Sequence, residues 1–231
     1  MSKYKHLFFD LDHTLWDYDT NAAAALTELH IKYDLYGKSG FTAQELITNF
    51  FRVNYALWDE FNIGTIGKAD IRKLRFPRIF DGLGVGHDRI PLNFETEYVD
   101  LCPTKKATMP MALEVLDYLK GNFDIHVITN GFKEIQTTKM ASALLTPYFT
   151  EVITSESAGF RKPDPRVFEF ALGLAGASKE ESLMIGDNLV ADVGGARNAG
   201  IDQVYFNPNK ASHQEKVTHE IENLGQLMEL L

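Results

Sequence analysis

A short apolar run near the start of the chain, Leu7–Phe9, ends in Asp10, and a second acid, Asp12, follows two residues later. Runs this short, rich in aromatic residues and bounded by polar ones, are typical of buried strands in a parallel sheet. In open α/β sheets the chemistry lies just beyond the carboxyl ends of the strands, where Asp10 would lie. Two carboxylates this close repel each other unless a cation or a shared proton compensates them. On this stretch alone, a turn residue or a helix cap is the commoner explanation of an aspartate after a strand.

From residue 110 onward, apolar runs alternate with amphipathic stretches. This alternation predicts a parallel, doubly wound sheet with right-handed crossovers. Ser178–Glu181 has the residue spacing of a capping box, which is typical of a helix start. The predicted strands are Asp124–Thr129, Glu151–Thr154, Leu183–Ile185 and Gln203–Phe206, and the predicted helices are Met111–Lys120, Gly131–Leu145, Pro165–Ala175, Leu189–Ala199 and Glu222–Leu230.

The stretch between Trp16 and Pro103 has a different character, with helical spacing of its apolar residues and no convincing strand. Thr42–Glu45 is a capping box in front of a long apolar-periodic segment. The glycines of Gly37–Gly40 predict a turn. We therefore expect an all-helical block that interrupts the sheet after its first strand, with helices at Asp17–Asp34, Thr42–Phe61, Lys68–Phe80 and Pro91–Leu101.

The chain has 231 residues, of which 45% are hydrophobic, enough for a real core in one large domain or in one domain plus an insert. Its formal net charge of -9 argues against binding to a nucleic acid polymer or to an anionic membrane, because both need a cationic surface. The single cysteine, Cys102, excludes an internal disulfide and fits a reducing compartment. No apolar stretch approaches membrane-spanning length, so we expect a cytoplasmic protein, either a monomer or a homodimer.

Polar residues also follow the second strand and one later loop. The segment Thr129–Gly131 offers a hydroxyl and backbone N–H groups where a helix begins, which suits either an anion site or a helix cap. Further on, Lys162 precedes Pro163, and the proline favours an extended backbone that would hold the ammonium in a fixed place. A lysine ammonium is a compact charge that suits phosphate and carboxylate oxygens, although loop lysines are usually just solvated.

The Leu183–Ile185 strand is followed by Gly186 and Asp187, with Asp192 five residues beyond. Asp187 thus leaves its strand as Asp10 leaves the first one. A small set of hard oxygen ligands suits Mg²⁺, which keeps several waters and the substrate's phosphate oxygens as further ligands. Each of these signals is weak alone, but all of them fall at strand or loop ends that would meet in one crevice.

In order and spacing, four motifs match those of the haloacid dehalogenase-like superfamily, and the chain resembles that family over essentially its whole length. The motifs are Asp10–Thr14, Thr129–Asn130, Lys162–Pro163, and Gly186–Asp187 with Asp192. The resemblance implies an α/β fold: a Rossmann-like parallel sheet core with an inserted all-helical cap domain. Here the core would comprise residues 1–16 and 105–231, and the cap residues 17–104.

By this resemblance the catalytic chemistry would be phosphoryl transfer to an aspartate. Asp10 would be the nucleophile, and Asp12 would protonate the leaving oxygen and later take a proton from the attacking water. Lys162 would neutralise both the phosphate and the nucleophile. The segment Thr129–Gly131, with Thr129 also counted as catalytic, would bind phosphoryl oxygens through the hydroxyl and the backbone N–H of Asn130.

The resemblance also implies Mg²⁺ as the cofactor. Its ligands would be the Asp10 carboxylate, the Asp12 backbone carbonyl and the Asp187 carboxylate, and the ion would shield the repulsion between an anionic nucleophile and an anionic phosphate. Asn188 and Asp192 would lie behind these ligands, where Asp192 would orient a metal-bound water or Lys162.

Individual residues separate branches of the superfamily. Asp12 favours phosphate over carbon–halogen chemistry, because halide-releasing members lack an acid at this position. His13 stands where sugar-phosphate mutases usually carry glycine, which counts against an isomerase. The segment Leu11–Asp17 and the following Asn21–Leu26 resemble bacterial pyrimidine 5′-nucleotidases. The implied partner is a small-molecule phosphomonoester, with phosphoglycolate or sugar phosphates as the alternative substrates and a phosphate-sensing module as the non-enzymatic reading.

A basic cluster in the helical block contains Arg72, Lys73, Arg75 and Arg78. Solvated positions on a helix face are the simpler explanation, since exposed charges are common. The alternative hypothesis is that Arg75 or Arg78 contacts the substrate's leaving group.

Overall fold

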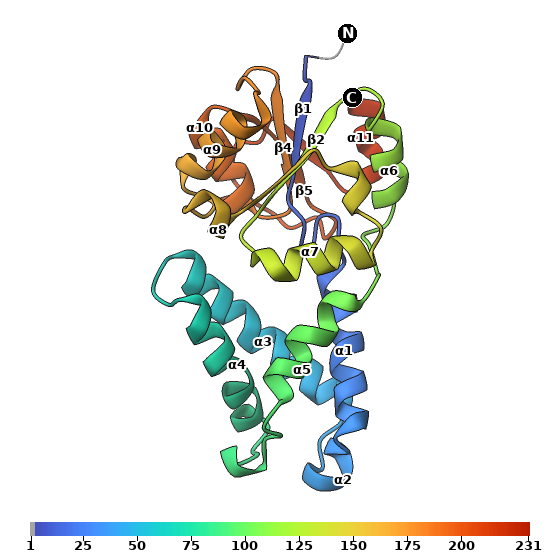
Figure 1. Cartoon of the computed structure of the whole chain (residues 1–231), viewed down its shortest axis with the longest axis vertical. Coiled ribbons are helices and arrows are strands. Elements are labelled where there is room, and N and C mark those ends of the chain that lie inside the picture. Colours follow the sequence, from blue (N-terminus) through green and yellow to red (C-terminus); the bar gives the residue numbers. More distant parts are fainter. Residues whose placement is uncertain (1–2) are drawn as a thin grey trace. The chain divides into compact units, whose positions relative to one another are not determined.

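The computed structural model describes residues 3–231 and divides the chain into two compact units. One unit contains the chain up to Tyr18 together with Lys106–Leu231, and the other contains Asp19–Lys105 (Figure 1). The first holds a β-sheet flanked by helices and the second is helical throughout. The expected fold class, a Rossmann-like parallel sheet with an all-helical insert, is therefore confirmed.

The sheet has six strands in the order β3-β2-β1-β4-β5-β6, and each neighbouring pair is parallel. Its first strand lies between β2 and β4, so the chain winds to one side of β1 and then to the other, as expected for a doubly wound sheet. The strands are β1 His6–Phe9, β2 Asp124–Thr129, β3 Glu151–Thr154, β4 Ser182–Gly186, β5 Asp202–Phe206 and β6 His219–Ile221. Strand β6, which has only three residues, was not predicted from the sequence.

Register explains why the predicted site residues meet. Phe9 pairs with Val127 on one neighbouring strand and with Ile185 on the other. The residues that follow these three positions therefore leave the sheet at the same edge. This edge receives Asp10 from the central strand and the motif residues that follow β2 and β4.

Helices cover both faces of the sheet (Figure 1): α9 and α10 lie on one face, and α6 and α11 on the other. They are, with the other helices of this unit, α6 Ala112–Leu119, α7 Lys133–Ser142, η3 Thr146–Tyr148, α8 Ser155–Ala158, α9 Pro165–Ala175, the π-helical turn η4 Leu189–Gly194, α10 Gly195–Ala199, η5 Leu224–Gln226 and α11 Leu227–Leu230.

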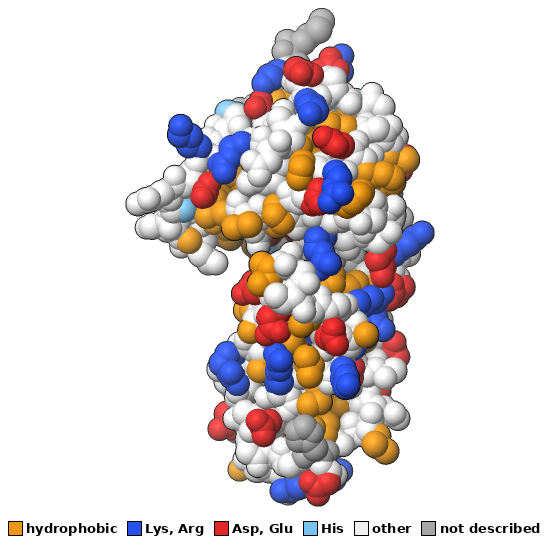
Figure 2. All heavy atoms as spheres, turned by 90° about the vertical axis from the view of Figure 1, so that its left-hand side faces the viewer, with side chains coloured by type: hydrophobic (Ala, Val, Ile, Leu, Met, Phe, Trp, Pro, Cys, Tyr) orange, Lys and Arg blue, Asp and Glu red, His pale blue; other side chains and the backbone are white. Residues whose placement is uncertain are grey.

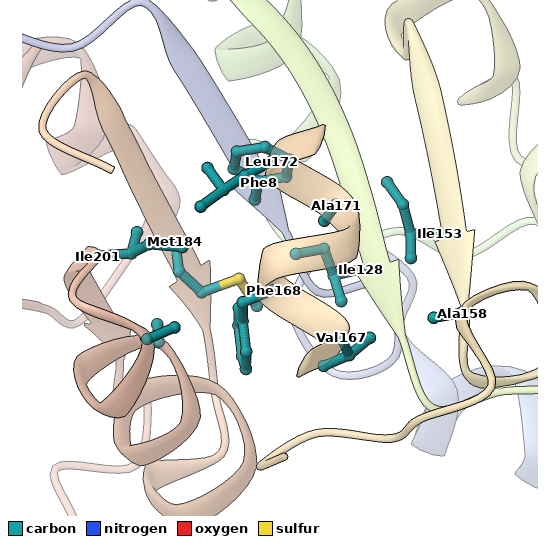
Figure 3. Packing of buried hydrophobic residues seen from close by; sticks show 12 residues of the cluster. Phe8, Ile128, Ile153, Ala158, Val167, Phe168, Ala171, Leu172, Met184 and Ile201 are labelled. Carbon is teal, nitrogen blue, oxygen red and sulfur yellow. The ribbon is translucent and has the colours of Figure 1, made fainter. Parts of the chain in front are cut away.

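One core cluster joins the strands to α9 (Figure 3). Phe8, Ile128 and Met184 of three adjacent strands pack with Phe168, which is fully buried. Close packing extends to α10, because a Cβ at Gly195 would lie 2.6 Å from the Phe168 ring. Truncating a fully buried phenylalanine in such a core costs about 3–5 kcal/mol.

Three local predictions differ from the structure. Ser178 and Glu181, predicted as a capping box, make a bond between their two side chains, 3.4 Å from Oγ to Oε2, and the chain continues directly into strand β4 instead of a helix. Residues 37–40, predicted as a turn, lie in and directly after the short helix α2, Leu35–Ser39. The helix predicted over Glu222–Leu230 is instead the 3-10 turn η5 followed by the short helix α11.

The helical unit contains α1 Tyr18–Lys32, α2, α3 Ala43–Asn62, α4 Lys68–Gly82, η1 His87–Arg89, α5 Phe94–Leu101 and η2 Cys102–Thr104. Its longest helix, α3, begins with the predicted capping box, in which the Thr42 hydroxyl accepts from the Glu45 N–H and the Glu45 carboxylate accepts from the Thr42 N–H. An aromatic cluster forms the interior of this unit, with ring contacts among Phe50, Phe76, Phe80, Phe94 and Tyr98.

The two chain connections to the helical insert are held together within the sheet unit. The Asp17 N–H donates to the Ala107 carbonyl at 3.1 Å, and the Met109 N–H donates to the Leu15 carbonyl at 2.9 Å. Between these two bonds, Trp16 and Thr108 form an antiparallel bridge. The outgoing and returning segments are thus a short two-stranded ladder.

The surface carries charges of both signs. On the face drawn in Figure 2, Lys and Arg side chains are interspersed with Asp and Glu rather than gathered into one cationic patch. Over residues 3–231, none of the helices combines the length and the apolar character that crossing a membrane requires.

Candidate active site

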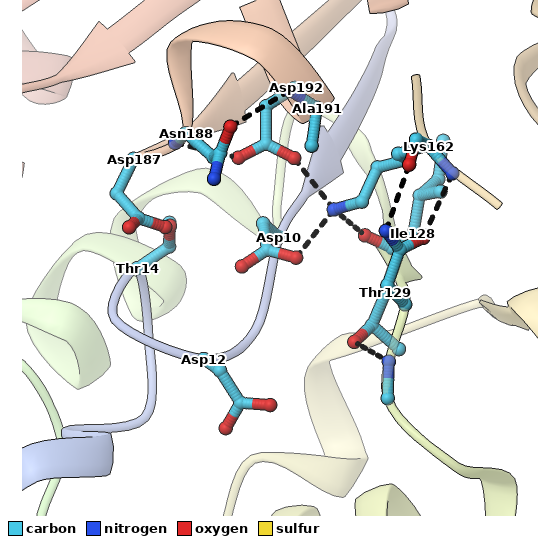
Figure 4. A network of polar contacts seen from close by, with 12 residues as sticks. Asp10, Asp12, Thr14, Ile128, Thr129, Lys162, Asp187, Asn188, Ala191 and Asp192 are labelled. Atoms are coloured by element: carbon cyan, nitrogen blue, oxygen red, sulfur yellow. Dashed lines mark hydrogen bonds and ion pairs between the residues drawn. The ribbon is translucent and has the colours of Figure 1, made fainter. Parts of the chain in front are cut away.

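The buried ammonium of Lys162 lies at the centre of the site (Figure 4). Its Nζ donates to Asp10 Oδ1 at 2.5 Å and to the Ile128 carbonyl at 2.7 Å, and it lies 2.6 Å from Asp192 Oδ1. The Lys162 residue is only 2% exposed. Burial acts to lower the pKa of Lys162, but the charges of Asp10 and Asp192 raise it above its ordinary value. Lys162 is therefore a fixed positive charge.

The side chain of Asn130 holds the lysine loop in place. Its Nδ2 donates to the Lys162 carbonyl at 2.9 Å, and its Oδ1 accepts from the Lys162 N–H at 2.8 Å. This two-way amide contact ties the end of β2 to a loop 32 residues further along the chain. Only the backbone N–H of Asn130 was predicted to take part in the site, so this side-chain contact is new.

Three carboxylates lie close together here, two of them in contact with that ammonium. Oxygens of Asp10, Asp187 and Asp192 all lie within 4.8 Å of one another. Asp187 accepts from the Thr14 hydroxyl at 3.0 Å, while Asp192 Oδ2 accepts from the Asn188 N–H at 3.0 Å. The Asn188 side chain in turn caps the helical turn that carries Asp192, accepting from two backbone N–H groups.

Close packing at the end of β4 fixes one of these acids. A Cβ added to Gly186 would lie 2.3 Å from Asp192 Oδ2, so only glycine leaves room for the carboxylate at this point. The absence of a side chain at Gly186 therefore makes room for the Asp192 carboxylate, which comes from the following helical turn.

The three acids together carry more negative charge than the neighbouring lysine balances. Burial raises the pKa of Asp10 well above its ordinary value, and the charges of Asp192 and Asp187 add to the effect while Lys162 opposes it. Burial and the Asp192 charge raise the pKa of Asp187 to about 7. One lysine does not balance three carboxylates, and a set of hard oxygen donors this close fits a divalent cation such as Mg²⁺.

Asp12 has different surroundings, apart from the Lys162 group (Figure 4). Its Oδ1 accepts from Lys139 Nζ at 2.6 Å and its Oδ2 from Gln136 Nε2 at 2.9 Å. Burial acts to raise the pKa of Asp12, but the Lys139 charge and these two hydrogen bonds bring it below its ordinary value. Both donors come from α7.

The Thr129 hydroxyl is prepared to donate. Its oxygen accepts from the Gly131 N–H at 3.0 Å and from Gln136 Nε2 at 2.7 Å. A hydroxyl oxygen has two lone pairs, and both are used here. Any further partner of Thr129 must therefore accept its proton, as a phosphoryl oxygen does.

Every residue of the predicted site thus lies in one of two adjoining groups. Lys162 and the three clustered acids form one, with Asn130 and Asn188 supporting it; Thr129, Gly131 and Asp12 form the other, joined by Gln136. Three further participants were missed: Thr14, Gln136 and Lys139. Thr14 belongs to the first motif, whereas Gln136 and Lys139 carry no local signal beyond their spacing of three residues on one helix face.

In the helical unit, Arg75 is buried against Glu95. Its Nε donates to Glu95 Oε2 at 3.1 Å, its Nη1 contacts Asn54 Oδ1 at 3.3 Å, and its guanidinium lies 4.8 Å from the centre of the Tyr98 ring. Arg78 is more exposed and pairs with Glu60 at 3.2 Å. The contacts of Arg75 thus give it a structural role inside this unit, and substrate contact by either arginine stays a hypothesis.

Comparison with known proteins identifies the relatives of this chain. The pyrimidine 5′-nucleotidase PynA of Streptococcus pneumoniae is 35% identical over 232 residues, spanning 99% of this chain and 95% of the relative. The pyrimidine 5′-nucleotidase YjjG of Escherichia coli is 28% identical over 232 residues, spanning 99% and 98%. These relatives confirm the resemblance that the first motif suggested.

The fold has a counterpart among solved structures. The crystal structure of the HAD-hydrolase YfnB from Bacillus subtilis, bound to magnesium, matches 99% of both chains with a TM-score of 0.87 and 26% sequence identity. The sequence profile of haloacid dehalogenase-like hydrolases matches residues 4–200. With the site geometry described above, these findings show that the chain belongs to the haloacid dehalogenase-like hydrolase family.

Proposed function

We propose that the protein is a magnesium-dependent phosphomonoester hydrolase that works through an aspartyl-phosphate. The observation that carries this proposal is the buried Asp10–Lys162 pair at the end of the central strand, beside two further carboxylates. A nucleophilic carboxylate, a fixed cation next to it and oxygen ligands for a metal are the parts that such a reaction needs.

In the first step the Asp10 carboxylate attacks phosphorus, an O–P bond forms, and the bond to the ester oxygen breaks. The departing oxygen takes a proton from the Asp12 carboxyl and leaves as an alcohol. In the second step a water attacks the aspartyl-phosphate and gives its proton to the Asp12 carboxylate. Inorganic phosphate and the Asp10 carboxylate are released, so atoms and protons balance.

Two side chains and one backbone N–H would bind the transferred group during both steps. Lys162, ion-paired with Asp10 at 2.5 Å, would neutralise the phosphoryl oxygens that approach this carboxylate. Thr129 would donate its hydroxyl proton to another phosphoryl oxygen, since both of its lone pairs are occupied. The backbone N–H of Asn130 would supply a further donor at the same strand end.

The acidic cluster fits Mg²⁺, and the Asp10 carboxylate, the Asp12 carbonyl and the Asp187 carboxylate would hold it. When bound, the ion supplies positive charge that shields an anionic nucleophile from an anionic phosphate. Asp192 and Asn188 would keep Lys162 and the metal-holding strand end in place. The magnesium-bound structure of the Bacillus subtilis relative supports magnesium as the ion.

For the substrate, we infer a nucleoside 5′-monophosphate, with a pyrimidine base preferred. The support is the similarity along nearly the full chain to two relatives named pyrimidine 5′-nucleotidases. In this proposal the sheet unit is the catalytic core and the helical unit is the cap that selects the leaving group. The second candidate is phosphatase activity on phosphoglycolate or small sugar phosphates, and glyceraldehyde 3-phosphate phosphatases among the partial matches favour it.

The test is phosphate release from pyrimidine and purine nucleoside monophosphates, phosphoglycolate and small sugar phosphates, with Mg²⁺ and with a chelator. We expect magnesium-dependent turnover that is fastest on pyrimidine monophosphates. Turnover on sugar phosphates alone would keep the mechanism and discard the nucleotidase assignment. No turnover on any ester would discard the hydrolase proposal in favour of a phosphate-sensing module.

A further inference from the structure

Lys139 is a buried cation that the chemistry above does not use. Its side chain is 6% exposed, its Nζ lies 2.6 Å from Asp12 Oδ1, and it lies 4.5 Å from the centre of the Trp16 ring. Tyr18 contributes a second ring at 5.4 Å. Removing an ammonium from water is costly unless a carboxylate and aromatic faces compensate it. The Lys139 ammonium is therefore buried in contact with the Asp12 carboxylate.

Gln136 is also buried and, like Lys139, binds the Asp12 carboxylate. Its Nε2 donates both to Asp12 Oδ2 at 2.9 Å and to Thr129 Oγ1 at 2.7 Å, while its buried Oε1 has no hydrogen-bond partner among the described residues. An unpaired buried carbonyl costs stability. A Cβ at Gly131 would lie 2.0 Å from Nε2, so a glycine is needed to admit this amide.

These two residues hold Asp12 from one rigid element. Lys139 and Gln136 lie three residues apart on α7 and bind different oxygens of the same carboxylate. Two contacts to two oxygens fix both the place of the carboxyl group and the plane in which it lies. A proton transfer depends on this orientation as well as on distance.

We propose that Lys139 and Gln136 are positioning residues that align the Asp12 carboxyl group for proton transfer to the leaving oxygen. The proposal rests on the phosphohydrolase function inferred above. Gln136 also joins Asp12 to Thr129, so the proton carrier and a phosphate-binding hydroxyl are set relative to each other by one amide.

Alignment of an acid matters only when the leaving oxygen needs a proton. An alkyl ester, such as a nucleoside 5′-monophosphate, leaves as a strongly basic alkoxide unless it is protonated. An aryl ester such as p-nitrophenyl phosphate leaves as a stabilised phenolate and needs little help. The ratio of kcat/KM for the two esters therefore measures how much the acid contributes to catalysis, because kcat/KM depends on the reaction steps up to cleavage of the ester bond.

The experiment compares Lys139→Met and Gln136→Met with the unchanged enzyme on both esters, at saturating Mg²⁺. We expect kcat/KM on the nucleoside monophosphate to fall about 10²-fold or more. The fall on p-nitrophenyl phosphate should be at least about tenfold smaller. Asp12→Asn provides the scale for complete loss of the acid. Lys133→Met, an exposed lysine at the start of the same helix, is the matched control and should leave both values unchanged.

An equal fall on both esters would overturn the positioning role and leave a structural one. Thermal unfolding of each variant identifies any that fail to fold, and for those the milder Gln136→Asn, which shortens the amide by one methylene, gives the same comparison. If the unchanged enzyme hydrolyses neither ester, the proposed function itself fails. If it hydrolyses both but Asp12→Asn does not separate them, the function stands and the positioning proposal falls.

Discussion

Two lysine–aspartate pairs lie close together in this site, and they are built in opposite ways. In the Asp10 pair, one buried ammonium faces a group of three carboxylates, and burial together with the other acids raises the pKa of Asp10. In the Asp12 pair, one ammonium and one amide serve a single carboxylate, and the pKa of Asp12 is lowered. The number of acids that share a cation, rather than distance to it, separates the two.

This difference matches the division of labour that we propose. The crowded Asp10 side has excess negative charge, which suits it to a divalent cation and to a phosphate brought by that cation. The balanced Asp12 side has no need of a further cation, and its lowered pKa favours the carboxylate, the form that takes a proton from the attacking water. Two aspartates separated by one residue thus acquire different chemistry from their surroundings.

Substituting each acid should have the largest effect on kcat/KM and should separate the roles of Asp10 and Asp12. Asp10→Asn removes the nucleophile, so we expect kcat/KM to fall at least about 10⁴-fold on both alkyl and aryl phosphates. Asp12→Asn removes only the proton carrier, and we expect a fall of about 10²–10⁴-fold on alkyl phosphates with a smaller one on aryl phosphates. Equal losses for the two variants on both esters would contradict the assigned roles.

Removing each lysine should separate the two sides by stability. Lys162→Met leaves Asp10 and Asp192 buried without their cation, and breaking a buried pair in this way costs about 3–5 kcal/mol of unfolding free energy. Lys139→Met leaves only Asp12, whose side chain is 25% exposed and keeps Gln136, so we expect about half that cost. Urea unfolding at pH 7 in the presence of a chelator measures both.

The reverse order of stabilities would show that the Asp12 side depends more on its cation. Lys162→Met with Asp192→Asn is the matched control, because it removes one of the two stranded carboxylates. We expect this double variant to recover part of the loss.

Two glycines allow each side to be disturbed without touching its charges. In Gly186→Ala the new Cβ meets Asp192 Oδ2, and in Gly131→Ala it meets Gln136 Nε2. We expect each to lower kcat/KM by roughly 10–100-fold through displaced side chains. Gly186→Ala should raise the Mg²⁺ concentration needed for half-maximal activity, whereas Gly131→Ala should widen the gap between alkyl and aryl esters. A shared phenotype would mean that the two sides are not separable.

The smallest effect concerns a buried histidine that belongs to neither side but enters any acid-stability measurement on them. Burial and the nearby His6 lower the pKa of His126 to about 4, although Asp124 opposes the shift. Between pH 6.5 and 4 the unfolded chain binds the extra proton, so the stabilisation from neutral His126 is lost as the pH falls through this range. His126→Phe should therefore reduce the loss of unfolding free energy between pH 7 and pH 5 by about 2 kcal/mol. Chemical denaturation of both proteins at the two pH values measures the difference, and identical pH dependence would contradict it.

Residues at strand ends could be predicted from the sequence because strand and position are encoded together. Asp10 follows its apolar run directly and Asp187 follows its own after one glycine, and parallel strands bring such positions to one edge. The contacts of Gln136 and Lys139 with Asp12 span more than 120 residues of chain and depend on how α7 packs, which no local pattern records.

The other differences between prediction and structure also have physical causes. Ser178 and Glu181 have the spacing of a capping box, but their contact joins the two side chains, whereas a capping box joins each side chain to a backbone N–H, and a strand follows. Strand β6 is too short for a periodicity of two to be visible. Arg75 looked like one of several exposed basic residues, and its burial depends on Glu95, 20 residues further along the chain.

The ladder formed by residues 15–17 and 107–109 has a consequence for how this architecture can change. Because the two ends of the insert are already hydrogen-bonded side by side, the entropy of closing the intervening loop grows only slowly with its length, by about 0.6 kcal/mol for each doubling. The stability of the sheet unit should therefore depend only weakly on the length of the inserted segment. If the helical unit selects the substrate, as we propose, an insertion point of this kind would let that unit be exchanged while the sheet unit is kept unchanged.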